Sequence, residues 1–280
     1  MGTKIFDDFV DALLNMVYPQ FCAGCGRWDT PLCACCVSDM TAQWKRADAS
    51  TPFLQYVDPA GGPDISAFPI YSSLTYQGVV AQAVVAWKNT QSAGLTRAMR
   101  AVWQANLATI CCGKTMESLF PGHKSGRAVA VVPLPSRWRR KHDGRMIVLD
   151  LAQIVGEVFA VPCIEVLKKR RSRGVFTLAE AGWKPALGAE LKMRLGTALA
   201  KIGQLGGGYA VETFTGRAKK RNSICATRDL RGWDVILVDD VVTTGATFDA
   251  AFRAVRNAGG RVIGGFSFAM APDPRISPVA

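Results

Sequence analysis

The chemically most informative stretch of the chain is residues 235–247, which read VILVDDVVTTGAT. The apolar run 235–238 predicts a strand that is buried on both faces. Two adjacent acids, Asp239 and Asp240, follow it. A turn over residues 243–247 then supplies hydroxyl groups and a glycine that lets the backbone approach a ligand, ahead of a helical run. Because backbone N–H groups at a helix start favour negative charge, this order of residues predicts an anion site at the carboxyl edge of a parallel sheet.

A second group of reactive residues lies near the start of the chain, where Cys22 and Cys25 form one C-x2-C pair and Cys33 and Cys36 form another. Each pair places two thiolates on one turn, and two such turns can close a tetrahedral Zn²⁺ site. Four protein ligands leave no open coordination position, so the predicted site is structural. Cys35 could replace Cys36 if the second turn is distorted, and the alternative to a metal site is a set of incidental buried thiols.

Residues 235–247 resemble the phosphoribosyl-diphosphate (PRPP) loop of type I phosphoribosyltransferases. An ordinary strand-to-helix turn would need neither two acids nor three threonines. The resemblance implies that Asp239 and Asp240 accept hydrogen bonds from the 2′- and 3′-hydroxyls of the ribose, and that Mg²⁺ arrives with PRPP. It also implies that the 5′-phosphate is wrapped by Thr243, Thr244, Gly245, Ala246 and Thr247.

Taken in order along the chain, several patches together resemble the ComF family, which comprises phosphoribosyltransferase-fold proteins associated with natural competence and DNA uptake. The matching patches are the four cysteines, Tyr76-Gln77-Gly78 with Lys88, residues 131–144 and residues 235–247. Two departures stand out. Gly144 is followed by Arg145 and Met146 in place of the usual Gly-Phe-Asn-Gln, and residues 171–208 show no counterpart of the family's flexible-loop segment.

An enzyme with this loop would transfer ribose 5-phosphate to or from a nucleophile, with Mg²⁺-pyrophosphate leaving. Three arginines just past the predicted strand 128–132 are candidates for the pyrophosphate, because the loop after the first strand faces the ligand in this fold. These candidates are Arg137, Arg139 and Arg140. The sequence assigns no general base and no catalytic residue, so it leaves open whether the protein is an enzyme.

The net charge of +12 is concentrated in three short clusters, in residues 137–145, 168–173 and 217–221. One pyrophosphorylated sugar needs only a few cations, so this charge could serve a larger polyanion or be a solvated basic surface. A rival hypothesis is therefore a non-catalytic module that binds single-stranded DNA, with Trp138, Trp183 and Trp233 as stacking candidates. A third hypothesis is an accessory protein that binds a DNA-uptake helicase through the zinc module.

With 280 residues and 49% apolar residues, the chain can bury a complete α/β core and one small extra module. We expect an N-terminal helix and four-cysteine module at 1–46, a linker at 47–68, a phosphoribosyltransferase-like domain at 69–271 and a loose tail at 272–280. No run approaches about 18 uninterrupted apolar residues, so no membrane span is expected. The start lacks the features of a signal peptide, and nine cysteines in a cytoplasmic protein would be thiols or metal ligands.

The hydrophobic pattern predicts an α/β fold. The resemblance implies that it is a type I phosphoribosyltransferase-like parallel sheet with helices on both faces, plus a small N-terminal zinc-ribbon-like module. The expected strands are 71–76, 128–132, 162–167, 235–238 and 261–270. The expected helices are 6–18, 79–88, 93–110, 146–159, 189–202 and 248–258.

Overall fold

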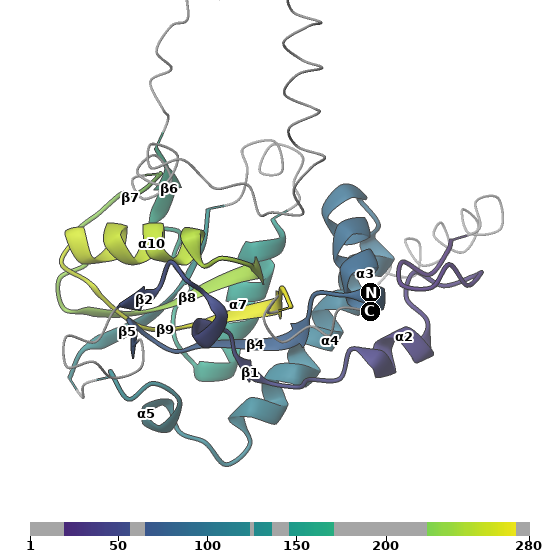
Figure 1. Cartoon of the computed structure of the whole chain (residues 1–280), viewed down its shortest axis with the longest axis horizontal. Helices are drawn as coiled ribbons and strands as arrows, with labels where there is room; N and C mark the ends of the chain where they lie inside the picture. The colour runs from purple at the N-terminus through teal and green to yellow at the C-terminus, as the bar shows by residue number, and fades with distance from the viewer. Residues whose placement is uncertain (1–19, 57–64, 124–125, 136–145, 171–222, 273–280) are drawn as a thin grey trace, which may run out of the picture.

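A computed structural model describes residues 20–56, 65–123, 126–135, 146–170 and 223–272 of the chain (Figure 1). Several sequence predictions lie outside these residues. They are the helix at 6–18, the helix at 189–202, the pyrophosphate candidates Arg137, Arg139 and Arg140, the stacking candidates Trp138 and Trp183, the basic clusters at 137–145 and 217–221, and all but the first residue of the tail at 272–280.

The centre of the fold is a five-stranded sheet in the order β1-β4-β9-β8-β5. Four of its strands run parallel, and the short edge strand β1 pairs antiparallel with β4. The parallel strands are the long apolar runs of the sequence, as expected for strands that are covered on both faces. The strands are β1 Lys45–Arg46, β4 Ile70–Thr75, β9 Arg261–Met270, β8 Trp233–Val242 and β5 Ala128–Pro133.

The helices predicted at 79–88, 93–110, 146–159 and 248–258 are all present, with small shifts at their ends. None of the described helices is long and apolar enough to cross a membrane. The helices are α2 Ala34–Asp39, η1 Ala47–Ser50, α3 Gly78–Asn89, α4 Ala93–Cys111, α5 Met116–Leu119, α7 Ile147–Phe159 and α10 Ala246–Asn257.

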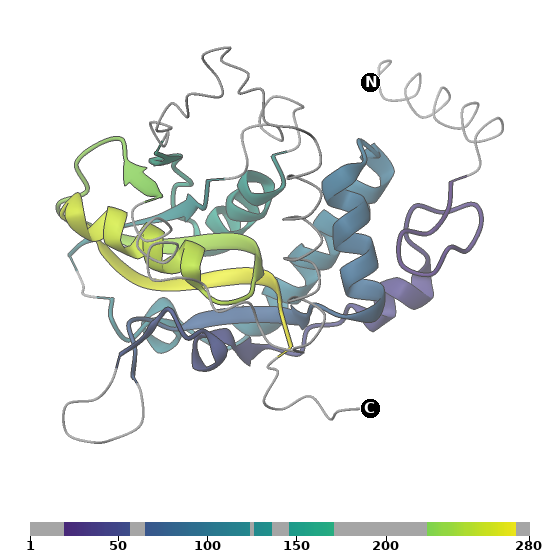
Figure 2. The same cartoon turned by 45° about the horizontal axis from the view of Figure 1, so that its top comes forward.

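The two faces of β8 belong to two different cores. Ile236 and Val238 pack in the core that contains α3, α4 and α7, whereas Val235 and Leu237 pack in the core that contains α10. This alternation is the pleat of a strand with both faces buried. Figure 2 shows α10 on the near side of the sheet, with α7 beyond it. The three layers leave the carboxyl ends of the parallel strands at one edge, where the loop after β8 lies.

The prediction of a strand over residues 162–167 is wrong. This segment touches the sheet only through a single bridge between Val131 and Cys163. Strand β6, Leu167–Lys169, begins at its end and pairs with β7, Ile224–Ala226, in a separate antiparallel sheet. The apolar run is short because the exposed Glu165 interrupts it, and one β-bridge to the central sheet is formed.

Residues 47–68, predicted as a linker, contain structure of their own where they are described. Besides η1 they include β2, Gln55–Tyr56, which pairs with β3, Ile65–Ser66. Ala47, Leu54 and Phe68 are buried in the same core as α10. The segment therefore packs on the face of the sheet that α10 covers, and the proposed domain boundaries remain predictions.

The opposite edge of the sheet is fixed by Asp234 at the start of β8. This fully buried carboxylate accepts hydrogen bonds from the Nε of Arg127 at 2.8 Å and from both Nε and Nη2 of Arg261, and it lies 3.0 Å from Nδ1 of His123. A buried carboxylate is tolerated when it is paired and hydrogen-bonded in this way. The cluster ties the starts of β5, β8 and β9 together.

Candidate phosphoribosyl-binding site and four-cysteine centre

Asp239 and Asp240 lie within β8, which continues to Val242 instead of ending at the acids. The pleat places their side chains on opposite faces of the strand. Asp240 shares the face of Val238 and so points toward α3, while Asp239 shares the α10 face. The Asp240 backbone N–H donates to Oδ1 of Asp239 at 2.9 Å, which fixes that carboxylate at the strand end.

The carboxylate of Asp240 has a direct cationic partner in Lys88, whose Nζ lies 2.8 Å from Oδ1. Both side chains are largely buried, with 16% of the lysine and 11% of the aspartate side chain exposed. Lys88 lies in the last turn of α3, where the helix dipole favours a cation. No role for this lysine could be derived from the sequence, because its partner lies far away along the chain.

Burial, followed by the charge of Asp240, raises the pKa of Asp239 to about 8. The hydrogen bond from the Asp240 backbone and the positive charges of Lys88 and Lys169 act in the opposite direction. Two carboxylates on consecutive residues cannot both ionise freely when the site is partly dry. At neutral pH the pair therefore favours holding a proton, and a ligand that supplies hydroxyl donors or a metal ion would favour its release.

Ser267 adds a polar group that sequence reasoning missed. It stands in register with Asp239 on the neighbouring strand β9. Its hydroxyl is fully buried and is the one buried side-chain oxygen or nitrogen without a hydrogen-bond partner in the described part of the chain. Buried hydroxyls without partners are rare, and this one lies at the strand pair that carries the acids.

The loop after β8 turns through Gly245, which has a left-handed backbone (φ 78°) and is the N-cap of α10. Thr243, Thr244 and Thr247 are exposed around it, and Ala246 is half-buried. The loop therefore presents hydroxyl groups and the first N–H groups of a twelve-residue helix to solvent, an arrangement that suits a phosphate.

The loop rests on the segment after η1. A Cβ at Gly245 would lie 2.8 Å from the Cβ of Thr51 and 3.4 Å from Leu54, and the backbone N–H of Phe53 donates to the carbonyl of Thr244. From the sequence, we explained this glycine by the close approach of a ligand to the backbone. In the structure its missing side chain is required by the turn conformation and by Thr51.

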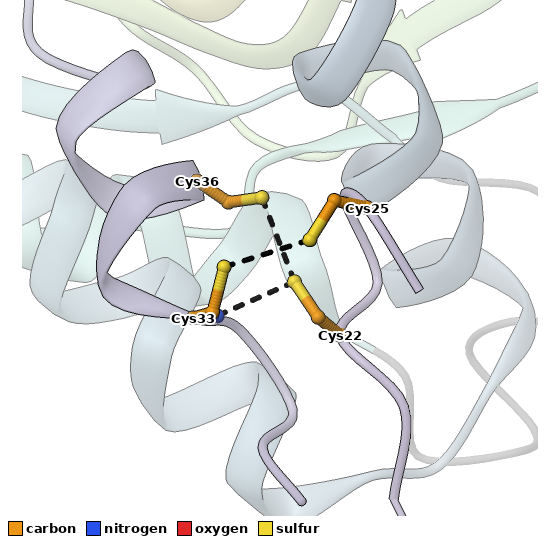
Figure 3. A group of neighbouring side chains, drawn as sticks. All are labelled: Cys22, Cys25, Cys33 and Cys36. Carbon is orange, nitrogen blue, oxygen red and sulfur yellow. Dashed lines mark hydrogen bonds between the residues drawn. The ribbon is translucent and has the colours of Figure 1, made fainter. Parts of the chain in front are cut away.

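The four predicted metal ligands come together in one cluster. The sulfur atoms of Cys22, Cys25, Cys33 and Cys36 all lie within 4.8 Å of one another. Figure 3 shows the first pair facing the second, with 3.6 Å between the sulfurs of Cys22 and Cys36 and between those of Cys25 and Cys33. A tetrahedral zinc with Zn–S bonds of about 2.3 Å separates its sulfurs by roughly 3.8 Å, so the cluster fits this ion.

The pKa values of the four thiols diverge within this cluster. Burial raises the pKa of Cys22, but backbone N–H groups, led by that of Cys33, more than offset burial and lower the pKa to about 6. Burial, followed by the hydrogen bond with Cys33, raises the pKa of Cys36. Cys35, which the sequence allowed as a substitute ligand, is exposed and lies outside the cluster, with its sulfur 4.0 Å from Nη1 of Arg27. The donor set is therefore four sulfurs with no open position, as in structural zinc sites.

The cysteine cluster packs directly against α3. Cys22, Cys33 and Cys36 belong to the same apolar core as Val80 and Val84 of that helix. A Cβ at Gly24 would lie 2.7 Å from Val79 and 2.8 Å from the sulfur of Cys36, so the turn between the first two cysteines approaches the helix closely. The cluster is thus joined to the helix that carries Lys88.

Comparison with known families identifies one match. The model of the phosphoribosyl transferase domain matches residues 203–276. The match includes the whole of β8, the loop and α10. Together with the observed sheet, it confirms the predicted α/β, phosphoribosyltransferase-like fold, with the four-cysteine cluster near the N-terminus. No curated protein matches the chain.

Several solved structures resemble the chain at low identity. Adenine phosphoribosyltransferase from Saccharomyces cerevisiae, solved with adenine and an imino-altritol bisphosphate, is 15% identical, with a TM-score of 0.30 over 78% of this chain and 83% of its own. The enzyme from Leishmania tarentolae is 10% identical, with a TM-score of 0.28 over 84% of this chain and 85% of its own. The family match, and not these structures, bears on the site.

We predict one bound Zn²⁺ per chain. Elemental analysis of protein purified without added metal should find about one zinc in the parent and in Cys35→Ser, which changes an exposed thiol outside the cluster. Cys33→Ser should lose most of the metal, because binding of a structural zinc contributes on the order of 10 kcal/mol through all its ligands. Well under one zinc in the parent, or equal loss in both variants, would contradict the assignment.

We also predict that Asp239→Asn stabilises the protein increasingly as pH rises. The folded pKa of Asp239 is raised from 3.8 to about 8, so the stability linked to its proton is full below pH 3.8 and is lost as pH rises to about 8. Asparagine cannot ionise and does not lose this contribution. The difference in melting temperature between variant and parent should therefore grow from about pH 5 to about pH 9.

The matched control is Asp229→Asn. A side-chain hydrogen bond from Arg231 is the main cause that lowers the pKa of Asp229, so its linked stability is lost only as pH falls. This variant should show no trend between about pH 5 and 9. A pH-independent difference for Asp239→Asn over the same range would show that the carboxylate is ionised throughout.

Proposed function

We propose that the protein binds PRPP, or another ribose 5-phosphate ester, together with Mg²⁺ at the end of β8. Asp239 and Asp240 would accept hydrogen bonds from the ribose hydroxyls. The phosphate would lie against the start of α10, at Thr243, Thr244, Gly245, Ala246 and Thr247. Mg²⁺ would be held mainly by the ligand's own oxygens and would neutralise the pyrophosphate.

The observation that carries this proposal is the order of groups along one continuous segment. Adjacent carboxylates on a central parallel strand are followed by an exposed threonine-rich turn and the open N-terminus of α10. Ligands of open α/β sheets bind at this carboxyl edge. The segment also lies wholly within the residues that the phosphoribosyl transferase domain matches.

If the bound ester reacts, positioning and charge neutralisation would supply most of the rate enhancement. The chemistry would be transfer of the ribose 5-phosphate group with departure of pyrophosphate. The resemblance of the sequence to the ComF family points to a role in DNA uptake or nucleotide salvage. Arg137, Arg139 and Arg140 remain candidates for the pyrophosphate, and the acceptor of the ribose is left open.

We predict that calorimetry will detect binding of PRPP with Mg²⁺ to the parent protein and weaker binding to Asp240→Asn. The loss should be roughly 1–3 kcal/mol, because a charge-assisted hydrogen bond is replaced by a neutral one. Asp229→Asn, an exposed carboxylate paired with Arg231, should bind as the parent does. Absence of heat and of a thermal shift with millimolar PRPP and Mg²⁺ in the parent would refute the proposal.

A second candidate function is a non-catalytic accessory role in DNA uptake, in which the protein binds single-stranded nucleic acid or a helicase. The observation that favours nucleic acid is a surface cavity of about 630 Å³ beside β7 and the end of α10. Four arginines line it: Arg170, Arg228, Arg231 and Arg253. Arg231 and Arg253 pair with Asp229 and Asp249, whereas Arg228 lies over the ring of Trp233.

If this cavity holds a phosphodiester backbone, Arg170→Ser/Arg228→Ser should reduce the salt dependence of oligonucleotide binding. The slope of log affinity against log salt changes by about 0.7 for each phosphate contact on a single strand, so the expected change is roughly 1.4. PRPP binding should be unaffected. Lys45→Ser/Lys114→Ser removes two exposed cations outside the cavity and is the control. Equal slopes in all three proteins would exclude the cavity as the contact.

A further inference from the structure

Lys88 of α3 and Asp240 of β8 are in direct contact at the edge of the sheet that carries the candidate site. Their charged atoms are 2.8 Å apart and largely shielded from water. Exposed ion pairs contribute little, whereas the attraction within a pair that is shielded from water is stronger and restricts the positions of both side chains. The pair lies beside Asp239, so it belongs to the same group of charges as the predicted ribose-binding acids.

Contacts other than the ion pair hold α3 in place. In the last turn, Trp87 is buried and its Nε1 donates to Oγ1 of Thr96 at 3.2 Å. In the first turn, Val79 lies against the turn of the cysteine cluster at Gly24. Val80 and Val84 fill the core between them. Helix α3 is therefore held in place without Lys88, and its packing places this lysine at a fixed position beside Asp240.

Four charged groups face one another at this point: Asp239 and Asp240 from β8, Lys88 from α3 and Lys169 from β6. Of the two lysines, Lys88 makes the ion pair with Asp240, and it adjoins the strand from the face to which Asp240 points. Without it, the Asp240 carboxylate would lose the ammonium group that lies 2.8 Å from its Oδ1 and that fixes the direction of its oxygens.

We propose that Lys88 is a positioning residue that holds the Asp240 carboxylate in the orientation in which it accepts hydrogen bonds from the ribose hydroxyls. This inference rests on the proposed function and deepens it. In this role Lys88 acts on the sugar through Asp240 and makes no contact with the phosphate. Its removal should therefore weaken ligands that carry the ribose and spare ligands that carry only phosphate.

The test is Lys88→Met, which keeps the length of the side chain and removes its charge. Binding of ribose 5-phosphate, measured by calorimetry, should weaken roughly tenfold at pH 7. Binding of inorganic phosphate, followed by phosphorus NMR, should not change.

Two further variants separate this role from a structural one. Lys88→Arg keeps the charge and should restore the affinity for ribose 5-phosphate. In Lys88→Met/Asp240→Asn, the lysine substitution should add no loss to that of Asp240→Asn, since both act through one carboxylate. Lys88→Gln, which is also uncharged, repeats the test if Lys88→Met does not fold, and the same selective loss is expected.

Equal loss for ribose 5-phosphate and inorganic phosphate would overturn the inference in favour of a direct phosphate contact. Unchanged affinity for ribose 5-phosphate in folded Lys88→Met would overturn it as well. Failure of the proposed function has a different signature, because the parent protein itself would then not bind ribose 5-phosphate.

Discussion

Two negative charges on consecutive residues of a central strand are the constraint around which the carboxyl edge of this protein is built. Asp239 and Asp240 repel each other, and burial adds to the cost of ionising them. An apolar strand would hold the sheet together better. The acids are tolerated because Lys88 contacts Asp240 directly and its charge also acts on Asp239. A ligand that supplied hydroxyl donors or positive charge at this edge would lower the cost further.

Much of the surrounding structure serves to fix the position of these charges. The cysteine cluster packs on α3, α3 carries Lys88, and Lys88 contacts Asp240. On the other face, Thr51 and Leu54 lie under Gly245 and support the loop that begins α10. The small four-cysteine module and a short irregular segment thus act on the same few residues from two sides. Both are too small to be stable alone, and both gain their packing from the sheet.

The sequence predicted the long parallel strands and their helices because their patterns are local. A run of β-branched residues followed by acids, threonines and glycine needs no distant partner to be recognised. The same holds for cysteines at fixed spacing, and the structure brings those four sulfurs together. Segments with weak patterns were misjudged. Residues 162–167 meet the central sheet at a single bridge, and residues 47–56 contain buried positions among polar ones.

The contacts that define the site could not be predicted, because they join segments far apart in the chain. Nothing near Lys88 indicates that its ammonium meets Asp240, and nothing near Ser267 indicates that its hydroxyl is buried in register with Asp239. Such pairings follow from the order of strands in the sheet and from which face each helix covers. Sequence periodicity gives the elements, whereas the order of strands is a global property of the fold.

One strand, β8, carries aspartates at both ends, and their surroundings separate structure from function. Asp234 is fully buried but receives hydrogen bonds from two arginines and lies beside His123, so its charge is compensated several times. Lys88 contacts Asp240 directly, and the positive charges of Lys88 and Lys169 also act on Asp239. These acids lie next to the loop and the start of α10, where Thr243, Thr244 and Thr247 are exposed. A ligand that brings hydroxyl donors or positive charge would stabilise the two acids further. We therefore place the proposed ribose 5-phosphate site at the carboxyl end of β8 and assign Asp234 a structural role.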